Sequence, residues 1–410
     1  MTTTSGCPVT HGFDPLDAEF LTNPFPQLAD MRAAGPVLHH AELDLYFVTR
    51  YADIEQVLLD RDTYLAANAS SPVYPVCPAA AEILAGGVRR VPTLTNADPP
   101  RHAPMRTAVL RNMSPRRIRS LEPVLREQTQ KILDGFNGQA SVDLVASLAF
   151  PLPGYAGFSL LGFPETDWEL LKSWCTKRIL LTYGRLSDEE QVEVAHNVVS
   201  FWSYVENHVA SRRSDPADDF TSDLLAWSDE HEEVTFNDCV SIVYSIALAG
   251  HDSTTNLFTG GLRYLLSNQD QWKMLVADPN LIDNAVEEML RYDPPILGWR
   301  RITSRPTTLA GVDLPQGAQL FMTFASGHHD DAHFPEPDRF DITRENARTH
   351  LSFGKGVHLC LGAPLARLEM KIALELLTAQ YPDLRLVESQ EFAMVPNLVF
   401  RTMHELLALT

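Results

Sequence analysis

The stretch Phe353-Gly354-Lys355-Gly356-Val357-His358-Leu359-Cys360-Leu361-Gly362 places one cysteine at the end of a glycine-punctuated loop. An amphipathic helical pattern follows directly and runs to about Tyr381. Gly354 and Gly356 permit positive φ angles or close backbone approach, so the loop can fold tightly around whatever Cys360 contacts. The free N–H groups of a helix N-terminus lower the pKa of a nearby thiol, and such a thiolate is a good axial ligand for a haem iron. The alternative is a buried structural cysteine beside a turn.

Composition and charge exclude several classes of protein. The chain has 410 residues, of which 45% are hydrophobic and 21% charged, as in an ordinary globular enzyme. A net charge of −20 makes nucleic acid an improbable partner. The five cysteines are scattered without a CxxC pair, which favours a reducing, cytoplasmic setting. No apolar run of about 18 residues and no N-terminal signal pattern occurs, so we expect no membrane anchor.

Hydrophobic periodicity predicts a mainly α fold with small β-sheets. Helical patterns cover residues 24–34, 53–60, most of 120–210, 221–227, 236–266, 281–292 and 361–381, and strand-like runs cover 36–39, 45–49, 299–303, 308–314 and 319–323. Residues 62–98 show no clean period and are expected to form a long loop. We expect residues 1–22 to be a loose lead-in and residues 23–410 to form a single domain, with no reductase fused after Thr410.

The longest helical pattern contains a polar break. Thr235 and Asp238 have the form of a capping box that opens it. Its middle is almost fully apolar up to Ala249, and then Gly250-His251-Asp252-Ser253-Thr254-Thr255-Asn256 follows. Glycine and hydroxyl groups in a buried helix reduce stability, and such a violation of local rules is expected at a functional site. The alternative is a packing glycine with hydroxyls bonded to carbonyls four residues back.

Two shorter patterns bring charged side chains onto one helical face. His102 and Arg106 are four residues apart, which suits either an anionic ligand or an ordinary solvated face. Glu288 and Arg291 are three apart and can form an ion pair. A basic cluster that is either a solvated face or a docking site for an acidic partner is formed by Arg111, Arg116, Arg117 and Arg119.

These motifs together resemble those of the cytochrome P450 family. The string Phe-Gly-x-Gly-x-His-x-Cys-x-Gly is similar to the family's haem-binding loop, and residues 249–254 resemble its oxygen-activating Ala-Gly-x-(Asp/Glu)-Thr-(Thr/Ser). Asp-Pro-Pro before His102 and Tyr-Asp-Pro-Pro after Arg291 complete the pattern, and the resemblance spans roughly residues 15–405. It implies a triangular helical prism with haem b between the long central helix and the helix after the cysteine loop.

The resemblance also implies roles for single residues. Cys360 would be the axial ligand of the iron. The residues expected to donate to the haem propionates are His102, Arg106, Arg301 (or Arg300, one residue earlier) and His358. The other expected haem contacts are Phe353, Ala249, Gly250 and Gly354. The expected structural ion-pair network is Glu288, Arg291 and Arg339. The expected substrate-pocket residues are Leu248, Ala249, Leu297, Gly298, Leu398 and Val399.

Proton delivery is expected from Asp252 and Ser253, with Thr254 as the alternative hydroxyl. Ser253 stands where the family usually has threonine. Serine keeps the hydroxyl but lacks the methyl group that restricts χ1, so we expect looser control of the rotamer and of coupling.

The activity implied by the resemblance is that of a haem-thiolate monooxygenase. It would activate O₂ and hydroxylate or O-dealkylate a small, mainly apolar substrate. Electrons would come ultimately from NAD(P)H through a ferredoxin or another iron–sulfur or flavin protein that docks near Arg111, Arg116 and Lys355. The alternatives are a peroxide-driven peroxygenase or isomerase of the same fold and a non-catalytic haem-binding sensor. The intact pair of Asp252 and a neighbouring hydroxyl disfavours both.

Overall fold

The computed structural model describes residues 9–10 and 13–410 and is mostly helical. Its α-helices are α1 (Ala18–Thr22), α2 (Phe25–Ala34), α3 (Tyr51–Leu59), α4 (Pro78–Gly87), α5 (His102–Asn112), α6 (Pro115–Ser120), α7 (Glu122–Asp134), α8 (Pro151–Leu161), α9 (Trp168–Tyr183), α10 (Asp188–Ser214), α11 (Phe220–Asp229), α12 (Phe236–Ser267), α13 (Gln269–Ala277), α14 (Ile282–Tyr292), α15 (Phe324–Gly327) and α16 (Ala363–Gln380). Shorter 3₁₀ or π turns lie at Val145–Ala149, Glu165–Asp167, Pro279–Leu281, Ala347–Thr349 and Gly356–His358.

The strands form three small sheets. They are β1 (Val9–Thr10), β2 (Val37–His40), β3 (Leu45–Val48), β4 (Tyr64–Leu65), β5 (Ser141–Asp143), β6 (Trp299–Thr303), β7 (Thr307–Leu309), β8 (Val312–Leu314), β9 (Gln319–Met322), β10 (Arg385–Leu386) and β11 (Leu407–Leu409). The largest sheet has the order β1-β2-β3-β9-β6-β4, with β1 parallel to β2 and β3 parallel to β9. The other sheets are β10-β11-β5 and the hairpin β7-β8.

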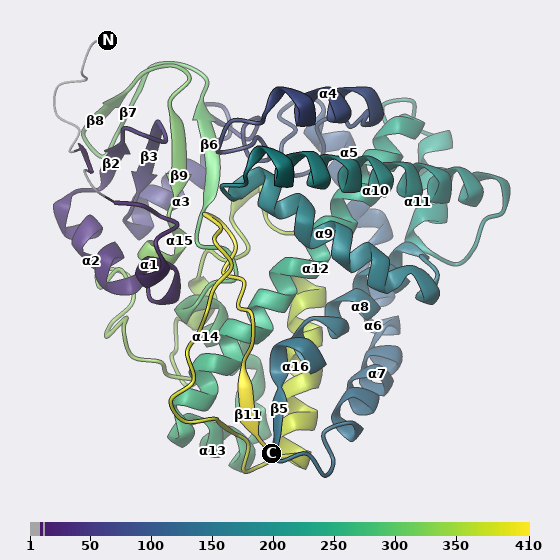
Figure 1. Cartoon of the computed structure of the whole chain (residues 1–410). Coiled ribbons are helices and arrows are strands. Elements are labelled where there is room, and N and C mark those ends of the chain that lie inside the picture. Colours follow the sequence, from purple (N-terminus) through teal and green to yellow (C-terminus); the bar gives the residue numbers. More distant parts are fainter. Residues whose placement is uncertain (1–8, 11–12) are drawn as a thin grey trace.

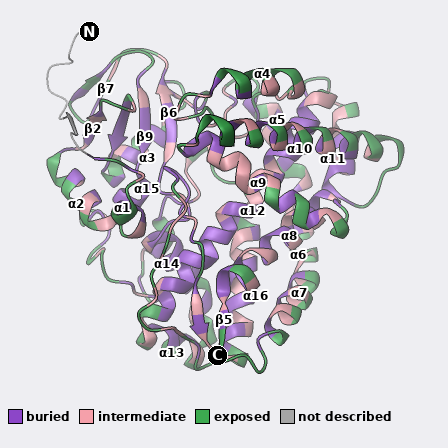
Figure 2. Ribbon diagram, viewed as in Figure 1, coloured by how far each residue is buried: buried purple, intermediate pink, exposed green. Residues whose placement is uncertain are grey.

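The elements form a prism that is broad at one end and tapers at the other, with the largest sheet confined to one edge (Figure 1). Helix α12 passes through the middle of this arrangement, and α16 lies beside it. A capping box formed by Thr235 and Asp238 starts α12, as the sequence predicts. Most of α12 is buried, whereas α4 and α10 show exposed outer faces (Figure 2). The predicted fold class is confirmed.

Two stretches carry more structure than the sequence analysis expects. The predicted loop 62–98 contains β4 and α4, because the alanine-rich segment 78–87 has good helix formers even though its apolar pattern is weak. The predicted lead-in contributes β1 and α1. Asp17 caps α1 and Phe20 is buried, so this segment packs on the body of the protein. Residues 1–8 and 11–12 of the lead-in lie outside the described residues.

Among the described residues, no helix is long and apolar enough to span a membrane.

Candidate active site

The cysteine loop closes tightly, as its glycines predict. Gly354 and Gly356 have φ values of 67° and 69°, a region that residues with a side chain rarely adopt. A Cβ on Gly356 would lie 2.9 Å from the carbonyl oxygen of Leu58, so the close approach of α3 also requires glycine there. The backbone N–H of Cys360 donates to the carbonyl of Phe353 at 2.8 Å, which pins the end of the loop to its start.

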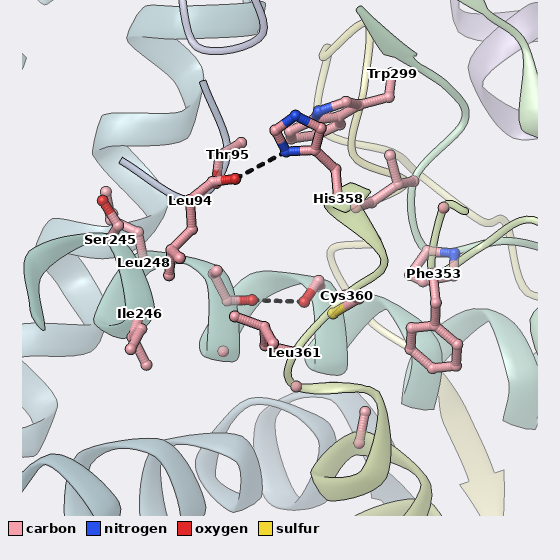
Figure 3. Close-up of a pocket in the computed structure, with 18 of the residues that line it drawn as sticks. Leu94, Thr95, Ser245, Ile246, Leu248, Trp299, Phe353, His358, Cys360 and Leu361 are labelled. Atoms are coloured by element: carbon pink, nitrogen blue, oxygen red, sulfur yellow. Dashed lines mark hydrogen bonds between the residues drawn. The ribbon is translucent and has the colours of Figure 1, made fainter. Parts of the chain in front are cut away.

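The Cys360 sulfur faces a cavity just before the N-terminus of α16. Withdrawal from bulk solvent raises the pKa of the Cys360 thiol, whereas hydrogen bonds from the backbone N–H groups of Gly362 and Ala363 lower it, as does the charge of Arg106. These N–H groups are the unpaired donors at a helix start, and they favour a thiolate. Figure 3 shows the sulfur with Ser245, Ile246 and Leu248 of α12 along one side of the cavity.

The cavity has a volume of about 320 Å³ and lies between the cysteine loop and α12. Its walls include most of the predicted site residues: Arg106, Leu248, Ala249, Gly250, Ser253, Thr254, Arg301, Phe353, Gly354, His358 and Cys360. Arg301, rather than the alternative Arg300, lines the cavity, because the Arg300 guanidinium points to the carbonyl of Ser71 and the amide of Gln319. Of the two arginines, Arg301 is therefore the one placed at the cavity, and its contact with a propionate stays a prediction.

A cluster of four nitrogen-bearing side chains at the cavity is suited to binding carboxylates. Its members are His102, Arg106, Arg301 and His358. The rings of His102 and His358 lie 4.2 Å apart between centroids. His102 does not line the cavity itself, but its Nε2 is buried and has no hydrogen-bond partner within the described chain. Arg106 donates to the carbonyl of Leu359 at 2.8 Å, and Arg301 donates to the carbonyl of Arg300 at 2.8 Å.

The charges of this cluster are not compensated by the protein. Burial lowers the pKa of Arg301 to about 10, and burial together with Arg301 and His102 lowers the pKa of His358 to about 3. Neither Arg106 nor Arg301 has a carboxylate within 4 Å in the described residues. The two propionate groups of a haem would supply the missing negative charges, so the donor set fits that cofactor. With Cys360 on the iron, the residues present can hold haem b.

A buried ion-pair network supports the loop that carries the cysteine. Both side chains of the Glu288–Arg291 pair are fully buried, with Nε 2.7 Å from the carboxylate. The third member is Arg344, whose Nε lies 3.2 Å from Glu288. The prediction of Arg339 is wrong. Arg339 is 58% exposed and lies near Glu336 and Asp341 instead, because its side chain leaves the loop on the solvent side.

The polar break in α12 faces both the cavity and the protein interior. Ala249 and Gly250 expose backbone to the cavity. The Ser253 hydroxyl donates to the carbonyl of Ala249 at 2.6 Å, and the Thr255 hydroxyl donates to that of His251 at 3.1 Å. The hydroxyls therefore bond to carbonyls four residues back, and Ser253 and Thr254 also line the cavity. The back-bonded hydroxyls of the structural alternative are therefore present, but its packing glycine is not, because a Cβ on Gly250 would meet nothing within 4 Å; the functional role of the stretch stays a prediction.

Asp252 points away from the cavity toward α9. Its Oδ1 accepts a hydrogen bond from Thr176 at 3.0 Å, and its buried Oδ2 has no partner within the described chain. Burial raises the pKa of Asp252 to about 7, although the Thr176 hydrogen bond lowers it. Because the carboxyl titrates near neutral pH, it can both take up and release a proton.

Four of the predicted pocket residues do not line the cavity, and this prediction is wrong. Leu297, Leu398 and Val399 pack in a separate apolar cluster, and the space at Gly298 is filled by Met322 and Phe321. The apolar side chains of these residues fill the protein interior behind the cavity wall, where they pack with Phe47 and Phe321. Pro295, Ile296, Trp299 and Phe400, their neighbours, form this wall instead.

Several lining residues were not predicted. Leu94 and Thr95 come from the segment expected to be a loop. The carbonyl oxygen of Leu94 lies 3.0 Å from Nδ1 of His358 and accepts a hydrogen bond from it, drawn as a dashed line in Figure 3. Ser245 and Ile246 lie on the cavity side of α12. Ser245 precedes Ala249 by four residues, so helical spacing could have indicated it. No comparable local signal marks Leu94 and Thr95.

The comparisons with known proteins agree with this geometry. A family model described as Cytochrome P450 matches residues 158–382. The chain is 33% identical to cytochrome P450 monooxygenase PikC of Streptomyces venezuelae, covering 97% of this chain and 94% of the relative. It is also 33% identical to vitamin D(3) 25-hydroxylase of Pseudonocardia autotrophica, covering 94% and 92%. The structure is also similar to that of cytochrome P450 CREJ in complex with (4-ethylphenyl) dihydrogen phosphate. The TM-score is 0.94 and the sequence identity 35%, over 97% of this chain and 99% of the CREJ chain.

The fold, the cysteine loop and these similarities define the class: the chain belongs to the cytochrome P450 family. It is a cytochrome P450 monooxygenase whose class uses a haem cofactor, O₂ and redox partners to act on small molecules.

Proposed function

We propose that this protein hydroxylates or O-dealkylates a small, mainly apolar organic compound, with electrons that originate from NAD(P)H and reach it through an external iron–sulfur or flavin protein. The observation that carries the proposal is the position of the Cys360 sulfur, which faces the polar break of α12 across a largely apolar cavity. The CREJ structure holds an aromatic ring bearing an ethyl group and a phosphate, and we propose a substrate of similar size for this protein.

Haem, when bound, supplies the activation of O₂ and the transfer of an oxygen atom to substrate. The chain's own residues hold the cofactor and prepare its surroundings. Cys360 would hold the iron, and His102, Arg106, Arg301 and His358 would bind the propionate carboxylates of haem. Burial raises the pKa of the Cys360 thiol, and the backbone N–H groups of Gly362 and Ala363 partly offset this by donating to the sulfur, which favours the thiolate needed for ligation.

The substrate is held on the α12 side of the cavity. Leu248, Ile296 and Phe400 exclude water and orient the substrate through apolar contact. Ser253 and Thr254 present hydroxyls to the same space, and Asp252 lies behind them. We infer that Asp252 takes a proton from the α9 side and that the hydroxyls pass it into the cavity.

The redox partner docks on the cysteine side of the molecule in this proposal. Arg111 and Arg116 are exposed and have no ion-pair partner among the described residues, so they suit an acidic protein. Arg117 is less available because it pairs with Asp218 and Asp223. Lys355 forms an ion pair with Glu55, so its charge is less available to contact the redox partner. The unpaired state of Cys77, Cys175, Cys239 and Cys360 supports the reducing, cytoplasmic setting that we propose.

An optical experiment tests the assignment. The ferrous protein with CO should show the red-shifted Soret band of thiolate ligation, and Cys360→Ala should lose it. Cys77→Ala, which removes a buried cysteine from a different cluster, should keep it. A wild-type protein without this band, or a Cys360→Ala variant that retains it, refutes the assignment of the ligand.

The alternatives are separated by turnover. Product that is formed in proportion to NAD(P)H consumed, with redox proteins present, supports the monooxygenase. Equal or faster turnover with peroxide alone favours the peroxide-driven enzyme, and tight ligand binding without product under either condition favours the sensor.

A further inference from the structure

Two further arginines line the cavity in addition to those of the carboxylate-binding cluster. Arg90 lies just after α4, and Arg178 lies in the last part of α9. Their common neighbours are Tyr244 of α12 and Tyr183 at the end of α9. The Arg90 guanidinium lies 5.9 Å from the centre of the Tyr244 ring, and both arginines lower the pKa of the buried Tyr183 and Tyr244 hydroxyls against the larger raising effect of burial.

Neither guanidinium has a counter-charge. No carboxylate of residues 13–410 lies within ion-pair distance of Arg90 or Arg178. The Nε of Arg90 is buried and makes no hydrogen bond within those residues, and Arg178 donates to the hydroxyl of Thr182. Burial lowers the pKa of Arg90, and the charge of Arg178 lowers it further. The protein therefore holds two like charges side by side at the edge of an apolar space, an arrangement that is unfavourable without an anion.

The carboxylates of haem do not account for this pair. They are matched by His102, Arg106, Arg301 and His358, whose charges act on one another. The two histidines of that cluster lie close to Arg106 and Arg301, whereas Arg90 lies close to Arg178, Tyr183 and Tyr244. The two sets of cations therefore have different neighbours, and we assign Arg90 and Arg178, beside Tyr244 of α12, to the substrate side.

We propose that Arg90 and Arg178 form an anion-binding subsite that receives the phosphate or carboxylate group of an otherwise apolar substrate. This inference rests on the proposed function and narrows its substrate class. A guanidinium presents paired donors that match an oxyanion, and two of them can neutralise the nearly two negative charges of a phosphate monoester. Thr182, which also lines the cavity, accepts a hydrogen bond from Arg178 and so helps to hold that guanidinium in place.

The position of the subsite also constrains where oxidation occurs. Tyr244, the α12 neighbour of both guanidiniums, precedes Ala249 by five residues, which corresponds to roughly 7.5 Å of helix rise. A substrate anchored by its anion therefore presents its far end to the Ala249–Gly250 backbone. The oxidised carbon should be separated from the anion by about the length of one substituted benzene ring.

The test uses three probes with the same apolar body: 4-propylphenyl phosphate, 4-propylbenzoate and the neutral 4-propylphenol. Binding to the haem-loaded protein is measured by calorimetry and by the change in spin state. We expect at least one anionic probe to bind about 10-fold or more tightly than the phenol. The anion that binds more tightly identifies the head group of the substrate.

Variants assign the effect to the two side chains. Arg90→Gln and Arg178→Gln should each remove most of the preference for the anion and leave the affinity for the phenol unchanged. Arg89→Gln is the matched control, because Arg89 is the exposed neighbour of Arg90 and does not line the cavity. Where a glutamine variant does not fold, Arg90→Lys or Arg178→Lys retains the charge and should retain part of the preference.

Equal affinity of the wild type for all three probes overturns the subsite, as does an equal loss for Arg89→Gln. A failure of the proposed function has a different signature. A wild type that prefers the anions but lacks the thiolate CO band would keep the anion subsite and reject the haem-thiolate activity. A wild type that shows the thiolate CO band but no preference for the anions would keep the haem-thiolate activity and reject the anion subsite.

Discussion

The guanidinium Nε of Arg344 lies 3.2 Å from the carboxylate of Glu288, although 56 residues separate them in the chain. Arg344 also donates to the carbonyls of Pro335, Glu336 and Arg339, so one side chain ties together most of the loop that precedes the cysteine segment. Glu288 is fully buried and also forms an ion pair with Arg291. The network links α14 to this loop and stabilises the cysteine side of the site.

This relationship predicts different effects for two arginines that lie close together in sequence. Arg344→Met leaves the Glu288 carboxylate incompletely paired in the interior, so it should lower the free energy of unfolding by roughly 3–5 kcal/mol. Arg339→Met removes only exposed contacts and should change it by less than about 1 kcal/mol. Urea unfolding of both variants provides the measurement. Equal destabilisation would contradict the assignment of Arg344 as the third member.

The raised pKa of Asp252 predicts a pH-dependent stability. Burial raises this pKa from 3.8 to about 7. Between these values the folded carboxyl keeps its proton while the unfolded one releases it. The Asp252 contribution to stability therefore falls as the pH rises through this window, by on the order of 1.4 kcal/mol per pH unit. Asp252→Asn removes the titration.

The measurement is chemical unfolding of the wild type and Asp252→Asn at several pH values between 4 and 8. The stability of the variant relative to wild type should increase with pH over this range. Asp313→Asn, which changes an exposed carboxylate of β8, is a control that should show no such trend. A constant difference between wild type and Asp252→Asn would show that Asp252 titrates at its ordinary value.

Turnover should depend on the same carboxyl. Asp252→Asn removes a proton carrier behind the α12 hydroxyls, so steady-state turnover should fall about 10²-fold while haem content and the CO spectrum stay unchanged. Thr176→Val removes the hydrogen bond that lowers the Asp252 pKa. The pH–rate profile of that variant should move to higher pH. Wild-type rates in Asp252→Asn would exclude Asp252 from proton delivery.

The serine in α12 predicts a change in coupling. Ser253→Ala loses the hydroxyl that faces the cavity, so a larger share of NAD(P)H should be consumed without product. Ser253→Thr keeps the hydroxyl and restricts χ1, so product formed per NAD(P)H should equal or exceed the wild-type ratio. Oxygen uptake and product are measured together. Unchanged coupling in Ser253→Ala would transfer the role to Thr254.

The docking proposal predicts a salt-dependent effect on electron transfer. Arg111→Glu with Arg116→Glu reverses two exposed charges, so reduction by an acidic ferredoxin should slow about 10-fold or more and lose its dependence on ionic strength. Reduction by dithionite should be unaffected. Arg89→Glu with Arg385→Glu, which reverses two other exposed charges, is the control matched for net charge. If the control slows the reaction equally, the effect reflects net charge rather than this surface.

Sequence alone determined the features whose causes are local. The cysteine loop was predictable because Gly354, Gly356 and the start of α16 lie within about ten residues of Cys360, and each constraint acts through the neighbouring backbone. The capping box and polar break of α12 were visible for the same reason. Arg301 and the Glu288–Arg291 pair also followed from short motifs.

Only the tertiary structure decided which side chains meet across the fold. Arg339 and Arg344 lie in an irregular loop, where no period indicates which guanidinium turns inward toward Glu288. Ile296 faces the cavity and Leu297 does not, because alternation in extended backbone specifies two faces without saying which one borders the cavity. The approach of Arg90 to Arg178 depends on how α4 and α9 both pack on α10, a long-range arrangement that the local sequence of neither segment encodes.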